Sequence, residues 1–433
     1  MSAAKSHKGA PAAAPASGGD QIGALPDEIL HRVLSFLPAQ QAVQTCVLAR
    51  RWIHLWKHAT GLRIVGPDGN APVPFEAARE FVDSLLLLRG ASPLEIFELK
   101  VARAAVDVRR MRLWIRYALQ HEVQELRLYI HGRTPTWAWP EDPPLASRNL
   151  TCLELHGLVF NHEFLDFSRC PALQHLKIKD CSFMFAERIS SQSLKHLHIE
   201  GGRFNHSSRT RIHVPNLASL WLQVTDGRAP VLEKMPMLIS ATVGILATCA
   251  DCCSRSNYGD CGNKSCRGCI QDDKSPLILC GISQAEAFVL AAYAKVFILR
   301  RDLKWCPTFS RLKSLTLCED WCVPDVRGLA CILEHSPVIE ELRLLVFFKG
   351  NLYKVMKGSF DPKELPSTIS AHLKRVEVLC GAGDGRVVEV LKFLSILNIS
   401  FSSSEYRSLK ADDKLLPLNS IGKLRCISGG TGN

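Results

Sequence analysis

The sequence predicts an α/β protein in which three short amphipathic helices near the N-terminus precede an irregular, twisted solenoid of short strands. Two patterns predict this fold. Apolar residues recur at the helical period between positions 25 and 56, and runs with apolar residues at i, i+3 and i+5 recur from position 123 onwards. A chain of 433 residues that is 47% hydrophobic and 22% charged is long enough for a large core and for more than one folding unit.

The cysteines and charges restrict the compartment and the partners. The 17 cysteines are spread along the whole chain, and no secretory signal is recognisable. Both observations indicate free thiols in a reducing compartment, either cytoplasm or nucleus. The longest apolar run, from Ala287, contains Lys295 and is too short to span a bilayer, so we expect no membrane partner. The net charge of +11 is scattered rather than clustered, which indicates solvation and argues against a nucleic-acid partner.

The first helix is expected to begin at Pro26 and to end before Pro38. Proline suits the first helical position, and Asp27 and Glu28 place negative charge at the positive end of the helix dipole. Two further apolar seams follow, one at Val43 and Val47 and one from Leu48 to Trp56, so we expect three short helices. Helices this short cannot bury all their apolar surface against each other, so some of it requires a partner. Residues 1–20, rich in Ala, Ser, Gly and Pro, are expected to form a disordered tail.

The stretch "LPDEILHRVLSFLP", followed by "AVQTCVLARRWIHLW", resembles the F-box of plant F-box proteins. The resemblance implies that residues 21–60 dock on a Skp-family adaptor and, through it, on the cullin of a ubiquitin ligase. The apolar positions that match the motif, and are therefore candidate adaptor-binding residues, are Leu25, Pro26, Ile29, Leu30, Val33, Leu34, Leu37, Pro38, Val43, Val47, Leu48, Trp52, Leu55 and Trp56. Some of them must hold the helices together instead. Alternatively, the stretch is an ordinary helical cap on the next domain.

One position departs from the motif. The family commonly has a serine before the basic pair, where it would cap the third helix, and this chain has Ala49. The loss of such a cap costs about 1 kcal/mol.

The remainder of the chain is repetitive. Runs such as "LQHLKI" begin at Val123, Leu150, Leu173, Leu194, Leu217, Leu312, Ile339 and Leu373. The first five starts are spaced by 27, 23, 21 and 23 residues, which is the range of leucine-rich repeats. Residues i+3 and i+5 share one face of a short strand, so neighbouring units must stack to bury them. Asparagines at the usual ladder position are mostly absent, which predicts an irregular solenoid. The alternative is a set of ordinary strands in an α/β domain.

The later repeats extend the family resemblance. The runs "LKSLTLCEDWCVPDVRGLACILEHSPVIEELRL" and "HLKRVEVLCGAGDGRVVEVLKFL" resemble plant proteins of the F-box, leucine-rich-repeat and FBD type. The resemblance implies a leucine-rich-repeat region at 61–350, with a Cys-rich insertion at 247–276, and an FBD-like repeat module at 351–402. The tail at 403–433 matches nothing recognisable.

The insertion contains two CxxC pairs, Cys249 with Cys252 and Cys266 with Cys269. Four thiolates brought together suit tetrahedral Zn²⁺, and nearby basic residues could offset their charge. A polar, glycine-containing insertion in a repeat array is also typical of a mobile, thiol-rich loop, which requires no cofactor. Both interpretations stay open.

The sequence contains no catalytic signature. No phosphate-binding loop appears, since "GAGDGR" lacks the lysine that such loops carry, and no cysteine or histidine has a nucleophile's surroundings. The leading hypothesis is a non-catalytic substrate receptor that raises the concentration of a target protein's lysines near the ubiquitin carrier. The alternative is a protein-binding leucine-rich-repeat scaffold that acts outside any ligase.

The alternation of side chains also predicts a target-binding face. If i+3 and i+5 point into the core, then i+2, i+4 and i+6 point to the open face. At i+4 this face includes Lys177, His198 and Trp221, a combination of aromatic and long polar side chains typical of a protein hot spot. The alternative is that Trp221 packs under a loop and the histidines are merely solvated.

Overall fold

The computed structural model describes residues 22, 24–102, 107–132, 137–139, 145–246, 249–251, 276–292, 302–319, 326–346, 372–381, 394–395 and 406–409. In this part of the chain, no helix is both long and apolar enough to cross a membrane.

The N-terminal unit contains two α-helices rather than the three expected. Helices α1 (Asp27–Ser35) and α2 (Ala39–Gln44) are followed by three 3₁₀ turns, η1 (Thr45–Val47), η2 (Arg50–Ile53) and η3 (Leu55–His58). Ala49 occupies the N-cap position of η2 and has no side chain that could accept a capping hydrogen bond. The seam from Leu48 to Trp56 therefore forms short turns, which still direct Trp52 and Trp56 into the core.

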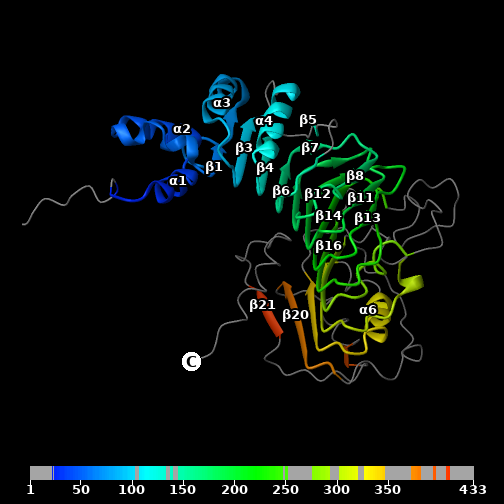
Figure 1. Cartoon of the computed structure of the whole chain (residues 1–433). Coiled ribbons are helices and arrows are strands. Elements are labelled where there is room, and N and C mark those ends of the chain that lie inside the picture. The colour runs from blue at the N-terminus through cyan, green and yellow to red at the C-terminus, as the bar shows by residue number, and fades with distance from the viewer. Residues whose placement is uncertain are drawn as a thin grey trace, which may run out of the picture.

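Among the described residues, one large sheet contains seventeen strands, and every pair in its ladders is parallel. Its main ladder runs, in order, through β1 (Gly61–Ile64), β3 (Ile96–Ala102), β4 (Glu125–His131), β6 (Cys152–His156), β9 (His175–Lys179), β12 (His196–Phe204), β14 (Ser219–Asp226), β16 (Ser240–Ile245), β17 (Ala287–Ala292), β18 (Ser314–Glu319), β19 (Glu341–Val346), β20 (Arg375–Gly381) and β21 (Tyr406–Leu409). The strands follow one another along a curved arc (Figure 1).

Each of the eight predicted repeats forms one strand of the main ladder. The strand always begins two residues after the first apolar residue of the run, so that "LQHLKI" from Leu173 gives β9 from His175. The same spacing holds for four further units that the sequence pattern did not reveal. Their first residues are Ala59, Leu94, Leu238 and Ala285, and they lead into β1, β3, β16 and β17.

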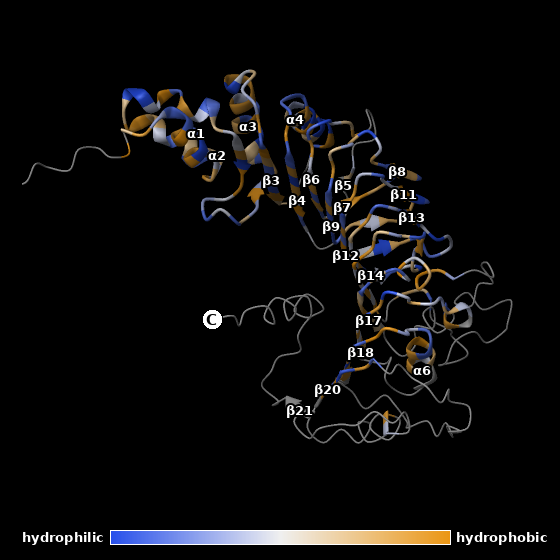
Figure 2. Ribbon diagram, turned by 60° about the horizontal axis from the view of Figure 1, so that its bottom comes forward, coloured by the Kyte–Doolittle hydropathy of each residue, from blue (hydrophilic) through white to orange (hydrophobic). Residues whose placement is uncertain are grey.

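An outer layer covers one face of the arc (Figure 2). It contains α3 (Phe75–Arg89), α4 (Val108–Gln120), η4 (Leu303–Trp305), α6 (Val326–Glu334) and a second parallel sheet of β8 (Phe164–Asp166), β11 (Arg188–Ser190), β13 (Arg211–His213) and β15 (Val231–Leu232). Three short strands, β5 (Trp137–Ala138), β7 (Leu158–Val159) and β10 (Ser182–Phe183), pair with one another in that order. Strand β2 (Val73–Pro74) pairs with β3. Side chains of this layer share one core with the main ladder.

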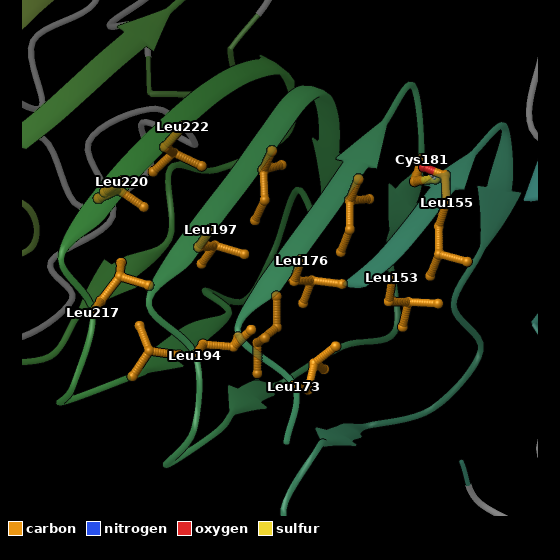
Figure 3. Packing of buried hydrophobic residues seen from close by; sticks show 14 of the residues in the cluster. Leu153, Leu155, Leu173, Leu176, Cys181, Leu194, Leu197, Leu217, Leu220 and Leu222 are labelled. Carbon is orange, nitrogen blue, oxygen red and sulfur yellow. Dashed lines mark hydrogen bonds between the residues drawn. The ribbon is translucent and has the colours of Figure 1, made fainter. Parts of the chain in front are cut away.

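The core between the layers is built from the residues at i, i+3 and i+5. In successive units these side chains lie in rows across the sheet, as Leu153, Leu176, Leu197 and Leu220 show, each no more than 2% exposed (Figure 3). Each row is a continuous apolar stack, because parallel strands in register place equivalent side chains side by side.

One further row and a buried cysteine pack near the ends of three successive units. Phe160, Phe183 and Phe204 stack on one another, with ring centroids 5.0 and 4.9 Å apart. Cys181 takes the place of the expected ladder asparagine, since its sulfur accepts from the backbone N–H of Leu158 at 3.3 Å. The aromatic stack and the cysteine account for an ordered turn without asparagine.

The loss of one inward side chain should therefore lower the free energy of unfolding strongly. We expect Leu176→Ala to lower the free energy of unfolding by about 2–5 kcal/mol, because the side chain is 1% exposed and its loss leaves a cavity. The measurement is urea denaturation followed by circular dichroism. Gln174→Ala, on an exposed position of the same unit, is the matched control. Equal effects of the two changes would contradict this packing.

Candidate functional site

Helix α1 presents one apolar stripe to the core. Leu30, Leu34 and Leu37 lie at i, i+4 and i+7, and Leu30 and Leu34 are 0% and 1% exposed. The polar residues Asp27, Glu28, His31 and Arg32 lie on other faces of the helix. This stripe is what anchors α1 to the rest of the chain.

A second apolar stripe lies beside the first and faces solvent. Pro26, Ile29, Val33 and Phe36 follow at i, i+3, i+7 and i+10, and Phe36 is 63% exposed. Three more exposed apolar side chains, Val47, Leu48 and Ile53, follow at the turns after α2. We call these seven residues the N-terminal apolar surface. Exposed apolar side chains in such number are typical of an interaction site.

The structure divides the fourteen predicted docking residues by burial. Exposed are Pro26, Ile29, Val33, Val47 and Leu48; partly buried are Leu25, Leu37 and Val43; buried are Leu30, Leu34, Pro38, Trp52, Leu55 and Trp56. The buried six hold the N-terminal unit together. Sequence reasoning missed Phe36 and Ile53, although Phe36 continues the exposed stripe by one more helical turn.

The second arginine of the basic pair fixes the surface in place. The Arg51 guanidinium donates to the Asp27 carboxylate at 2.8 Å from Nε and to the Leu25 carbonyl at 2.5 Å. It thereby ties η2 to the start of α1. A charge-assisted hydrogen bond of this kind holds two short elements that have little helical stability of their own.

The N-terminal unit is joined closely to the sheet. A Cβ on Gly61 would lie 2.6 Å from the Ser35 carbonyl oxygen, so only glycine lets β1 approach the end of α1 this closely. Arg63 donates to the Phe36 carbonyl at 2.8 Å and to the Glu98 carboxylate at 2.7 Å. Burial alone would raise the pKa of Glu98, but hydrogen bonds from Lys100 and Arg63 outweigh it and hold the pKa below its usual value.

The inner face of the arc brings the three predicted target-binding residues together. Lys177, His198 and Trp221 are register partners on the adjacent strands β9, β12 and β14. The His198 and Trp221 rings are stacked at 5.3 Å with an interplanar angle of 9°. Trp221 is half-buried, and its Nε1 is buried and lacks a hydrogen-bond partner among the described residues. We call Lys177, His198 and Trp221 the central row.

The surroundings of the central row are mixed in charge. Lys177 lies 3.7 Å from the Glu154 carboxylate, and Lys179 lies 3.1 Å from Glu200. A second ring pair, His175 on His196 at 4.6 Å, lies one row away and was not predicted as a contact. Towards β17–β19 the same face turns apolar, at Val289, Ala291, Cys318 and Leu345. No uniform anion or cation groove exists along these described strands.

Burial makes part of this face neutral. It lowers the pKa of His196 and His198, and nearby Glu200 only partly offsets the effect on His198. Both rings are therefore neutral at pH 7, and the face offers aromatic surface and hydrogen-bonding groups rather than imidazolium charge.

Of the four cysteines predicted as zinc ligands, the described residues include only Cys249. It is 3% exposed, and its thiol donates to the Gly227 carbonyl at 3.1 Å. Cys252, Cys266 and Cys269 lie outside the described residues. The zinc site at these positions therefore stays a prediction.

Comparison with known proteins agrees with both halves of this architecture. Residues 22–60 match the F-box domain family. The chain is 30% identical over 368 residues to an F-box/LRR-repeat protein of Arabidopsis thaliana, covering 75% of this chain and 76% of the relative. It is 29% identical over 358 residues to the MEIOTIC F-BOX protein MOF of Oryza sativa subsp. japonica, covering 75% of this chain and 71% of the relative. A putative FBD-associated F-box protein of Arabidopsis thaliana is 25% identical over 465 residues, covering 94% and 98%.

A short apolar helical unit joined to a parallel strand ladder thus defines an F-box protein with a repeat domain. The chain belongs to the plant family of F-box/LRR-repeat and FBD-associated F-box proteins. F-box proteins are generally substrate adaptors of Skp–cullin–F-box ubiquitin ligases.

The partly buried His198 predicts a pH dependence of stability. Because the pKa of His198 in the folded chain lies below the ordinary histidine value of 6.5, the unfolded chain binds more protons, and stability is lost as the pH falls through this region. Unfolding free energies measured between about pH 7 and pH 5 should fall less steeply in His198→Phe than in the unaltered chain. A slope in His198→Phe identical to that of the unaltered chain would contradict this assignment.

Proposed function

We propose that this chain is a substrate-recognition subunit of a Skp–cullin–F-box ubiquitin ligase, in which the N-terminal apolar surface docks on a Skp-family adaptor and the inner face of the arc holds a target protein. In this proposal the curved ladder is a leucine-rich-repeat solenoid, and residues 351–402 form the FBD-like module. The compartment is the cytoplasm or the nucleus, where F-box proteins generally act.

One observation supports the proposal most directly. The N-terminal apolar surface and the inner face of the arc belong to one continuous core. The N-terminal apolar surface belongs to helices and turns whose buried side chains share the core cluster of the sheet. The contacts of Gly61 and Arg63 join those helices to β1. A target on the inner face would therefore be held at a fixed orientation to the adaptor, which raises the effective concentration of its lysines near the ubiquitin carrier.

The chain itself performs no chemistry in this proposal. The inner face offers an aromatic ring stack, a lysine and hydrogen-bonding groups, which are binding features. Positioning two partners is sufficient for a receptor subunit, since the adaptor and cullin connect it to the enzyme that carries ubiquitin.

The adaptor-docking surface can be tested with charge substitutions at exposed positions. We expect Val33→Asp with Phe36→Asp to weaken adaptor binding about 100-fold or more, because a desolvated carboxylate in an apolar contact costs several kcal/mol. Both residues are exposed, so the fold should persist. The measurement is calorimetric titration of the full-length chain with a Skp-family adaptor.

The control places the same substitutions on another exposed apolar pair, Leu87→Asp with Leu88→Asp on α3. Undiminished binding by the docking variant would refute the surface assignment. Failure of the unaltered chain to bind any Skp-family adaptor would refute the ligase function and favour the scaffold that acts without a ligase.

The target surface predicts a different variant with a different effect. Trp221→Ala should reduce capture of ubiquitinated partners by about 30-fold, the loss of roughly 2 kcal/mol expected of an aromatic hot spot. Adaptor binding should not change. Capture is measured by quantitative mass spectrometry of proteins retained from plant extract, with Phe164→Ala, an exposed aromatic on the outer β8, as control. Retention of the same partners by Trp221→Ala would contradict the central row as the target site.

A further inference from the structure

A second group of metal-type ligands lies in the outer layer, far from both surfaces described above. In the part of the chain that the structure describes, one set of three potential ligand side chains, Cys306, Cys331 and His335, has all its ligand atoms within 4.8 Å of one another. All three are half-buried. The set is separate in sequence from the CxxC pairs of the insertion.

Two short elements supply the three side chains. Cys306 is the C-cap of η4, Cys331 lies in α6, and His335 directly follows α6. Cys331 and His335 are four residues apart, so they lie on one face at the end of the helix. The backbone N–H of Phe309 donates to the His335 carbonyl at 2.8 Å, which keeps the end of α6 beside the segment that follows Cys306.

A backbone carbonyl of α6 orients the His335 imidazole. His335 Nδ1 lies 2.8 Å from the Cys331 carbonyl oxygen, which can only accept, so Nδ1 is the hydrogen-bond donor. In a histidine that binds a metal, Nε2 would then supply the lone pair. Metal-binding histidines commonly donate their second ring nitrogen to a carbonyl or carboxylate in this way.

The donor set selects the kind of ion. Two sulfurs and one nitrogen suit Zn²⁺, whereas Mg²⁺ and Ca²⁺ prefer oxygen ligands. At a zinc–sulfur distance of about 2.3 Å, neighbouring ligand atoms of a tetrahedron lie roughly 3.7 Å apart. The observed limit of 4.8 Å therefore requires only a small contraction on binding.

The other buried thiols in the repeat layers behave differently. The thiols of Cys170 and Cys181 donate to backbone carbonyls, and burial raises the pKa of both. In contrast, the ligand atoms of Cys306, Cys331 and His335 lie within 4.8 Å of one another. A water would complete the fourfold set that zinc takes.

We propose that Cys306, Cys331 and His335 form a structural zinc site that clamps the end of α6 to the turn ahead of β18. Helix α6 has only nine residues, and an isolated helix of that length is unstable in water. The zinc would fix this helix against η4 and hold the outer layer over the C-terminal strands.

The test is the zinc content of full-length chains purified in reducing buffer without chelator. The reference carries Cys266→Ser and Cys269→Ser, so that the insertion cannot supply a second site. We expect about one zinc per chain in this reference, and none after Cys306→Ser and Cys331→Ser are added. Adding Cys152→Ser instead, a half-buried thiol on β6, should leave the zinc in place. No zinc in the reference, or zinc that survives the loss of Cys306 and Cys331, would overturn the proposal.

A second measurement needs no variant at the site and so does not depend on its folding. Alkylation of the unaltered chain, followed by peptide mass spectrometry, should modify Cys306 and Cys331 at least about tenfold more slowly before a chelator is added than after it, because zinc-bound thiolates are poor nucleophiles. Unchanged alkylation rates, or a Cys306–Cys331 disulfide in the chain before any chelator is added, would refute the zinc site.

Discussion

The architecture depends on the lateral stacking of parallel strands in register. One strand carries only three inward apolar side chains, such as Leu173, Leu176 and Ile178, and cannot bury them alone. Pairing with the strands on either side completes each apolar row and satisfies the backbone hydrogen bonds of the strand at the same time. Each layer therefore stabilises its neighbours, and the ladder can tolerate a non-leucine residue such as Ala241 within a row.

The stacking of parallel strands also includes the N-terminal unit. Ala59, Leu62 and Ile64 form the first layer of the ladder, and Trp56 packs in the same core cluster. The F-box is therefore continuous with the first repeat unit. This continuity explains why a glycine is needed at position 61, where the strand meets the end of α1.

Along each strand, the side chains that build the core alternate with the side chains that face the inner side of the arc. The inward residues are fixed by the stack, whereas the residues between them contribute little to the core and are free to vary. Lys177, His198 and Trp221 thus lie side by side because of strand register, while their chemistry is unconstrained by the fold.

The repeats, and the alignment of the central row, follow from the pattern of residues along the chain. A period of two in eight runs specifies which side chains face inward, and parallel stacking then makes neighbours of equivalent positions such as His198 and Trp221. Layers that begin with Ala59 or Ala285 escaped notice because their leucines are replaced, and only the pairing of their strands reveals them.

The tertiary structure alone decided which apolar residues of the F-box are free. Both stripes of α1 obey the helical period, so periodicity cannot tell Leu34 from Val33; packing against Trp56 and β1 buries one and leaves the other exposed. It also decided that the third helix forms short turns, because its residues are held by the core rather than by a capped helix. The cluster of Cys306, Cys331 and His335 was equally hidden, since residues distant in sequence become neighbours only when one layer packs on the next.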